Sequence, residues 1–367
     1  MTTATTEVTG DLEQGDATRP GRRRRSRGGG FSNYLVVRFL LIFPTIFILL
    51  TTVFFLMRST GDPITAALGG RLPPAQLAQR IHAAGYDRPL FVQYLSYLGG
   101  IVHGDFGTTL SDHRPVLDVL KTFGTATLEL AIYALIVAFV VGIPLGRLAA
   151  RWRDKLPDAV FRVFAILCYA TPVFFLGLLL KLIFSVKLGW LPVAGRASTS
   201  TEIEIDTLPH KTGIYLIDAF RTGDSGAVWD VLQHAILPAV ALGLLTGGIF
   251  LRLVRTNVIG TFGSGYVEAA RSRGVRERRL LRKHAYRPAL IPIITVIGLQ
   301  IALLLAGAVL TETTFEWKGL GFQLYTYLQA RDFVAVQGIV MLLAVIVAVT
   351  NFIVDIVAAL IDPRVRY

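Results

Sequence analysis

The stretch YVEAARSRGVRERRLLRKHAYRPALIP, residues 266–292, carries eight Lys or Arg and two Glu. The chain around it is apolar: 53% of its 367 residues are hydrophobic and 17% are charged, whereas soluble domains average about 25% charged. The mean hydropathy is +0.56. A hydrocarbon core excludes so polar a segment, which therefore separates the apolar segments on either side of it. The sequence thus predicts an all-α integral membrane protein.

Uncharged runs mark the helices that would cross a membrane, since a hydrocarbon core needs roughly 17–25 helical residues. Five uncharged runs have the length that a transmembrane helix needs: 39–57, 163–180, 235–251, 289–311 and 333–354. A sixth, 130–146, follows Glu129 and spans only if that carboxylate lies at the interface. We predict six transmembrane helices in a domain of residues 34–367.

Loop charges predict the orientation, because cytoplasmic loops of membrane proteins are enriched in Lys and Arg. With the N-terminus inside, the inner segments hold 23 Lys or Arg and the outer segments 12. The short loop 147–157 indicates the orientation more reliably than the long loops do, because the orientation of long translocated loops depends only weakly on their charge. It carries four basic residues and is inside in this orientation. Both termini are therefore predicted to be cytoplasmic.

Residues 1–33 are predicted to form a disordered, basic cytoplasmic tail, because they lack apolar periodicity and are rich in Thr, Gly and charge. The run RRRRSR, residues 22–27, either binds anionic lipid headgroups or only keeps the tail inside.

Two long outer loops are expected, at 58–122 and 185–234. The first contains apolar residues at helical spacing, which predicts an amphipathic helix that lies on the membrane or covers the bundle: Leu90, Tyr94, Leu95, Leu98 and Ile101. The second is Thr-rich, acidic and turn-rich, and we expect it to be partly strand-like or mobile.

Polar residues within the predicted spans are few. Glu129 is interpreted as a carboxylate at a helix N-terminus, with a role in a transport pathway as the alternative. Gln300 is expected to bond a neighbouring helix or to line a pathway. The only cysteine, Cys168, excludes an intrachain disulfide and is interpreted as a core residue.

Catalytic chemistry is not indicated by any motif. No GxxxxGK[ST] phosphate loop occurs, so if ATP drives this protein, another subunit binds it. We predict no catalytic, cofactor-binding or metal-binding residue in this chain and no nucleic-acid partner.

The polar stretch itself, within a loop predicted at 255–288, has features that a generic basic loop does not need. Good helix formers precede Gly274, which stands where a helix would end in the left-handed conformation. Small residues let a backbone enter a partner's groove, and leucines offer an apolar face. We therefore single out six residues for contact with a partner protein: Glu268, Ala269, Ala270, Gly274, Leu280 and Leu281.

The pattern EAA at 268–270, with Gly274 after it and a penultimate span to follow, resembles the signature of permease subunits of ABC importers. The continuation RRLLRKHAYRPALIP resembles their dipeptide and oligopeptide branch. Further pieces extend the resemblance over about residues 34–367: RPLFVQYLSYLGGIVHGDFGTT, GWLPVAG, ETTFEWKGLGFQLYTYLQARDFVAVQG and NFIVDIVAALIDPRVR. The general signature ends I-x-L-P, whereas this chain has His284, Tyr286 and Arg287 at those positions, a form similar to the peptide branch.

This resemblance implies a type I ABC importer permease fold in a bacterial plasma membrane. It implies a heterodimer with a second, homologous permease, ATP-binding subunits that hold ATP and Mg and receive the EAA segment, and an extracytoplasmic solute-binding protein. Trp317, Arg331 and Asp332 are candidate contacts for that binding protein or supports of a gate, with local packing as the alternative. The implied cargo is short peptides, with nickel chelates, glutathione or haem as alternatives.

Two other classes stay open on the residues alone. A channel should line its spans with rings of polar or charged groups, which these spans mostly lack. A membrane receptor or scaffold could use the same loops for its partners.

Overall fold

The computed structural model of the chain describes residues 30–280, Tyr286, Val296, Gln300, Leu304 and residues 307–361. The elements in these parts are all helical: α1 (Gly30–Ser59), α2 (Pro63–Leu68), α3 (Pro74–Ala83), α4 (Leu90–Val102), α5 (Val116–Arg151), α6 (Leu156–Ala170), α7 (Val173–Leu180), the π-helix η1 (Lys181–Lys187), α8 (Thr199–Asp206), α9 (Tyr215–Thr222), α10 (Ser225–Phe262), α11 (Gly265–Ser272), α12 (Glu277–Arg279), α15 (Leu320–Gln329) and α16 (Phe333–Ile361). Residues 307–315 are helical as well.

The predicted all-α class is thereby confirmed for the described residues, which contain no strand. Residues 1–29 of the predicted tail, Leu281 and most of the predicted span 289–311 lie outside the described residues. The last four residues assigned to the tail belong instead to the first turns of α1, which begins at Gly30.

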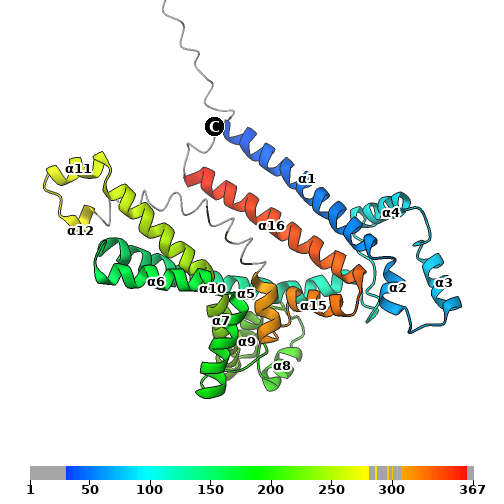
Figure 1. Cartoon of the computed structure of the whole chain (residues 1–367). Coiled ribbons are helices and arrows are strands. Elements are labelled where there is room, and N and C mark those ends of the chain that lie inside the picture. The colour runs from blue at the N-terminus through cyan, green and yellow to red at the C-terminus, as the bar shows by residue number, and fades with distance from the viewer. Residues whose placement is uncertain are drawn as a thin grey trace, which may run out of the picture.

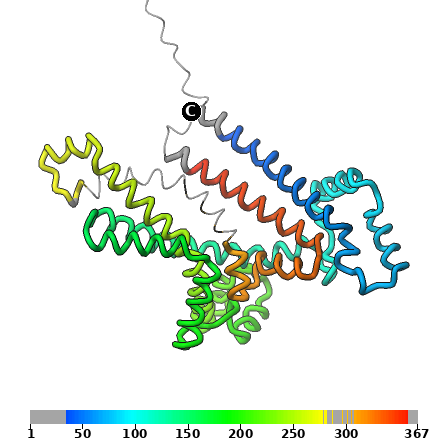
Figure 2. Tube along the Cα trace, viewed as in Figure 1, coloured from blue at the N-terminus to red at the C-terminus, as the bar shows by residue number. Residues whose placement is uncertain are grey.

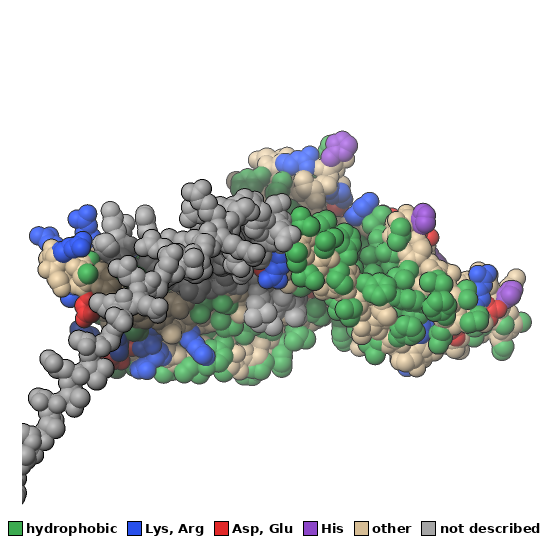
Figure 3. All heavy atoms as spheres, turned by 90° about the horizontal axis from the view of Figure 1, so that it is seen from above, with side chains coloured by type: hydrophobic (Ala, Val, Ile, Leu, Met, Phe, Trp, Pro, Cys, Tyr) green, Lys and Arg blue, Asp and Glu red, His purple; other side chains and the backbone are tan. Residues whose placement is uncertain are grey.

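Four described helices are long and apolar enough to cross a membrane: Leu35–Ser59 of α1, α5, α10 and α16. The pair α6 and α7 makes a fifth if the two are counted as one broken span. Large apolar side chains stay exposed on these helices, such as Phe43, Ile48 and Leu56 of α1. Exposed apolar helix faces of this size suit contact with lipid. Figure 3 shows apolar side chains over much of the visible surface, with Lys and Arg gathered at the end that carries α11 and α12.

The predicted third span is not one straight helix. The chain bends by 106° between α6 and α7, where Thr171 has an extended backbone (φ −78°, ψ 126°) before Pro172. A residue that precedes proline is disfavoured in the helical region, and proline has no N–H to continue the hydrogen-bond ladder. The predicted span 163–180 falls within this longer bent pair, and the prediction missed the break.

Helices α5 and α10 form the centre of the molecule and run parallel. A methyl group at Gly142 would meet the Gly247 carbonyl oxygen at 2.6 Å, and one at Gly146 would meet the Leu251 carbonyl oxygen at 2.7 Å. Only glycine permits backbones to approach so closely, as is common between membrane helices. Helix α6 packs against the same face of α10, with Cys168 buried against Gly248. The interpretation of Cys168 as a core residue is therefore confirmed.

Helices α1 and α16 run side by side in opposite directions (Figures 1 and 2). Near the start of α1, Arg38 pairs with Asp355 at 3.4 Å, and the Phe39 and Phe352 rings lie 5.8 Å apart. The beginning of α1 and the end of α16 are thus at the same end of the bundle. We call this end, which also carries α11 and α12, the coupling end, after the contact with an ATP-binding subunit that the resemblance implies for the EAA segment. The opposite end, with α2–α4, α8, α9 and α15, is called the loop end.

The two predicted outer loops are both helical. Helix α4 confirms the amphipathic helix: its Tyr94 is buried, and the Tyr94 hydroxyl lies 2.6 Å from the Thr51 hydroxyl of α1. The Thr-rich stretch was expected to be partly strand-like or mobile; the strand is wrong, because Thr199–Asp206 forms α8. Its Ile205 packs with Ala219 of α9 and Val231 of α10, so tertiary burial outweighs the weak helix propensity of threonine.

Candidate functional site

The EAA stretch forms a short helix beyond the end of α10. Helix α10 continues to Phe262, so the loop predicted from residue 255 begins later, and α11 follows after two residues. Val267 is fully buried and fixes α11 to the rest of the chain, whereas Glu268 and Ala269 are exposed and Ala270 is half-buried. In Figure 1, α11 and α12 project at the far end of α10 from α8 and α9. The segment 265–280, here called the coupling segment, is therefore accessible to a partner.

Gly274 has the left-handed conformation that the sequence predicted, with φ +77°. Its N–H donates to the Arg271 carbonyl oxygen (2.9 Å), and the Val275 N–H donates to the Ala270 carbonyl oxygen (3.3 Å), which closes α11. A Cβ atom built at Gly274 would meet no atom within 4 Å. The surface of this turn is thus bare backbone, open to close approach by another chain.

Arg271 holds the two short helices of the coupling segment together. Its Nε donates to the Glu277 carboxylate at 2.7 Å, and its guanidinium lies 4.9 Å from the Phe262 ring centroid. The Glu277 carboxylate raises the pKa of the Arg271 guanidinium, because the hydrogen bond favours the charged form. Glu268 lies in the first turn of α11, and its side chain is exposed, so its predicted contact with a partner stays a prediction.

Leu280 requires a correction. It was predicted to offer an apolar face to a partner, but its side chain is fully buried within this chain. A buried leucine supports the position of the segment and is not available for contact. Leu281, the other predicted leucine, lies outside the described residues.

An ion pair next to the coupling segment was missed by the sequence reasoning. Arg255 of α10 donates to both carboxylate oxygens of Asp158, at 2.6 and 2.7 Å, and the Asp154 N–H donates to the same group at 3.0 Å. Asp158 is fully buried in the first turn of α6. The available signal was an acidic residue near the start of one apolar helix segment and basic residues near the end of another. This bidentate pair ties α6 to α10 directly before α10 leads into α11.

Glu129 lies at a helix N-terminus, though not at that of its own helix. It is in the fourth turn of α5 and is 1% exposed. Its carboxylate accepts hydrogen bonds from the first two N–H groups of α9, at Tyr215 (3.2 Å) and Leu216 (2.9 Å), and forms an ion pair with Arg196. The Tyr133 hydroxyl donates a further bond (2.7 Å). The interpretation of Glu129 as a carboxylate at a helix N-terminus is thus supported, and the helix that it caps is α9.

Arg196, the partner of Glu129, is itself 6% exposed. Its guanidinium lies 3.6 Å from the Tyr215 ring centroid and 5.4 Å from that of Trp317. The indole N–H of Trp317 donates to the Ala126 carbonyl oxygen at 2.9 Å, and Trp317 has no exposed surface. This burial favours local packing for Trp317 over direct contact with a binding protein.

Another buried carboxylate, Glu312, caps α15 and was not singled out from the sequence. It accepts a hydrogen bond from the Thr127 hydroxyl (2.7 Å) and one from the Phe322 N–H (3.0 Å). A Cβ atom at Gly319 would lie 2.5 Å from this carboxylate, which explains the glycine there. The signal in the sequence was a lone Glu directly after an apolar run.

Asp332 is also buried and joins two parts of the loop end. It accepts from the Leu110 N–H (2.6 Å), the Ser111 N–H (2.9 Å) and the Ala335 N–H (3.2 Å), which links the segment before α5 to the start of α16. Its neighbour Arg331 is exposed, with φ +55°. Of the three residues proposed for an outer contact, only Arg331 is placed where a partner could touch it, and that contact stays a prediction.

Gln300 is 5% exposed, and its Oε1 has no hydrogen-bond partner among the described residues. It lies in the region where few neighbours are described, so its predicted role stays open. Within the described ranges, no group of three or more His, Cys, Asp or Glu could hold a metal ion.

Comparison with known proteins gives matches along nearly the whole chain. The family described as binding-protein-dependent transport system inner membrane component matches residues 142–367, and its N-terminal counterpart matches residues 31–141. The chain is 38% identical to the di/tripeptide transport system permease protein DppB of Pseudomonas aeruginosa, over 91% of this chain and 99% of the relative.

Two further relatives show the same coverage. The dipeptide transport system permease protein DppB of Escherichia coli K12 is 38% identical over 91% of this chain and 98% of its own length. The glutathione transport system permease protein GsiC of Escherichia coli O1:K1 is 33% identical over 91% of this chain and 99% of its own length.

These matches and the long apolar helices show a multi-pass protein of the bacterial plasma membrane. Its role is that of a permease subunit and not of an enzyme, because ATP hydrolysis in such systems belongs to separate subunits. The chain belongs to the family of inner membrane components of binding-protein-dependent transport systems.

Proposed function

We propose that this chain is one of two permeases that together form the pathway of an importer for short peptides, with the coupling segment docked on an ATP-binding subunit. The observation that carries this proposal is the accessible α11 with the bare Gly274 turn at the end of α10. A channel or scaffold does not need an exposed backbone turn, open to contact by another protein, at the end of a helix that crosses the bundle. The second permease and the solute-binding protein are inferred from the family.

Peptide cargo is proposed from the relatives. Two with dipeptide or di/tripeptide in their names are 38% identical to this chain, and the glutathione relative is 33% identical over the same share. Specificity for the cargo is assigned to the binding protein. Nickel chelates and haem have no support among these relatives.

The test of this function is the identity of small molecules that co-purify with the complex assembled from this chain, a second permease, the ATPase and the binding protein. We expect mass spectrometry to recover short peptides, and vesicles containing the complex to take up a labelled dipeptide only with ATP. Recovery of sugars or free metal alone would contradict the peptide cargo. Uptake that continues without ATP would favour a channel.

We also propose six spans with both termini cytoplasmic. The antiparallel α1 and α16 support an even number of crossings, and the parallel α5 and α10 are what a second and a fourth span require. The coupling end holds the inner segments of this arrangement.

Cysteine labelling tests this topology in a Cys168→Ser background, which removes the only native thiol. Val102 at the end of α4 is 83% exposed, so a membrane-impermeant maleimide added to intact cells should label Val102→Cys. The matched variant Ser272→Cys, exposed in α11, should react only after the membrane is permeabilised. The reverse pattern would overturn the orientation.

A further inference from the structure

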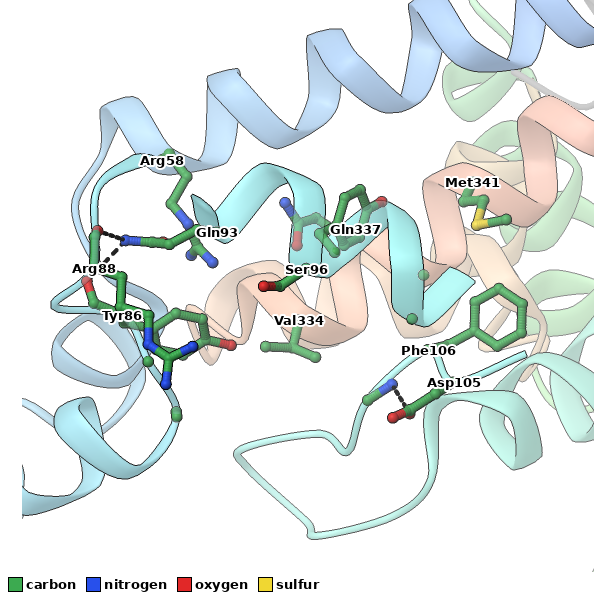
Figure 4. A pocket seen from close by; sticks show the side chains of 16 residues that line it. Arg58, Tyr86, Arg88, Gln93, Ser96, Asp105, Phe106, Val334, Gln337 and Met341 are labelled. Carbon is green, nitrogen blue, oxygen red and sulfur yellow. Dashed lines mark hydrogen bonds between the residues drawn. The ribbon is translucent and has the colours of Figure 1, made fainter. Parts of the chain in front are cut away.

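A polar pocket of about 310 Å³ lies at the loop end, away from the coupling segment. Its walls come from the end of α1, from residues 84–107 around α4, and from one face of α16. Figure 4 shows the Arg58 side chain reaching from α1 toward the space between Gln93 of α4 and Gln337 of α16. The predicted permease role makes no use of this pocket.

Arg58 places a guanidinium in the pocket, and no described carboxylate forms an ion pair with it. Its Nε and Nη1 atoms are buried and have no hydrogen-bond partner among the described residues. The guanidinium is held in place by two rings, with centroids 4.4 Å away at Tyr86 and 5.2 Å away at Phe54. Cation–π contacts position a charge but leave its N–H donors unsatisfied, and buried donors without partners are costly. The site therefore requires an acceptor, best an anion.

Two glutamines add one further donor and one acceptor. Gln337 is 6% exposed, and its Nε2 has no partner in the described chain. The Nε2 group of Gln93 donates to the carbonyl oxygens of Tyr86 (2.9 Å) and Arg88 (2.8 Å), which fixes the orientation of this amide. Its Oε1 is consequently left buried and without a partner. The pocket thus offers donors from Arg58 and Gln337 and a separate acceptor from Gln93.

We propose that this pocket binds a compact ligand that carries an anionic oxygen group next to an N–H or O–H donor. The anionic group accepts from Arg58 and Gln337, and the donor bonds Oε1 of Gln93. A volume of about 310 Å³ exceeds the need of a single inorganic ion and suits a group the size of a headgroup or an amino acid. Two sources have this chemistry: the headgroup of phosphatidylglycerol or phosphatidylethanolamine, and a free zwitterion such as a dipeptide.

Two of the helices that form the pocket also expose large apolar side chains. Phe91 and Leu95 of α4 are 68% and 52% exposed, and Leu56 of α1 is 58% exposed. Acyl chains can lie along such apolar surfaces while the headgroup enters the pocket. A free zwitterion would need no apolar surface, and Ser96 and Asp105 add polar groups to the pocket lining.

The experiment measures the thermal unfolding midpoint of the assembled complex, purified in detergent and freed of lipid, with three added probes. These are phosphatidylglycerol, phosphatidylcholine and glycylglycine. Phosphatidylcholine has the phosphate but no N–H or O–H donor, so it is the matched lipid control. We expect phosphatidylglycerol, glycylglycine or both to raise the midpoint more than phosphatidylcholine, and Arg58→Gln to weaken that binding roughly tenfold by removing a charged donor.

The matched control is Arg71→Gln, which removes an exposed arginine of the same outer segment that does not line the pocket. If Arg58→Gln prevents assembly, Gln337→Leu tests the same site with an apolar side chain of similar size. The complex is assembled without the binding protein, which would itself bind a dipeptide. A response to phosphatidylglycerol alone that Arg58→Gln weakens identifies a lipid site, and such a response to glycylglycine alone identifies a site for free zwitterions. The proposal is overturned if no probe stabilises the parental complex, or if the pocket variants respond as Arg71→Gln does.

Discussion

Glu129→Ala is expected to destabilise the loop end by about 3–5 kcal/mol, because it leaves the buried Arg196 charge without its counter-ion. The same change removes the acceptor for the first two N–H groups of α9. The complex should therefore unfold at a markedly lower temperature, and uptake should fall because α8 and α9 lose their attachment to α5. Thermal unfolding of the purified complex, followed by size-exclusion chromatography, measures the first effect.

An exposed ion pair supplies the control for this change. Asp206 pairs with Lys211 at 2.7 Å, but both side chains are largely in solvent. Asp206→Ala should cost at most about 1 kcal/mol, because exposed ion pairs contribute little. Glu129→Gln keeps the shape of the side chain and should fall between the two. Equal unfolding temperatures for Glu129→Ala and Asp206→Ala would show that the buried pair does not hold the loop end.

Gly274→Val is expected to abolish uptake and stimulated ATP hydrolysis while the chain still inserts into the membrane and still recognises the binding protein. A β-branched residue at φ +77° is strained by on the order of 1–2 kcal/mol. Within this chain its side chain meets nothing, so the strain alone leaves the packing intact. The larger effect comes from a side chain that projects into the interface with the ATPase. Hydrolysis and uptake by the reconstituted complex measure it.

Two controls separate strain from contact. Gly70 also has positive φ (+79°) and open space around it, but lies between α2 and α3, so Gly70→Val carries the same strain away from the coupling end. Gly274→Asn adopts positive φ at low cost and still adds a side chain at the interface. We expect Gly70→Val to transport and Gly274→Asn to be impaired. Transport at the parental rate by Gly274→Val, with the ATPase bound, would refute the coupling role.

The local features of the coupling segment were predictable because each depends on a few neighbouring residues. A run of helix formers that ends at glycine predicted α11 and the left-handed Gly274, and both are present. The apolar spacing around Tyr94 predicted α4 for the same reason. The prediction failed for Leu280, because a basic segment gives no indication of which leucine turns back toward the bundle.

By itself the sequence determined the membrane class, the all-helical fold, most apolar helices and the family, since composition, run length and short motifs are properties of the chain alone. Only the tertiary structure decided what the isolated charges do. Glu129 caps α9, Glu312 accepts from Thr127 of α5, and Asp158 binds Arg255, each across a large separation in sequence. A buried carboxylate must find N–H groups or a cation, and those partners are fixed only when distant helix ends converge in the folded bundle.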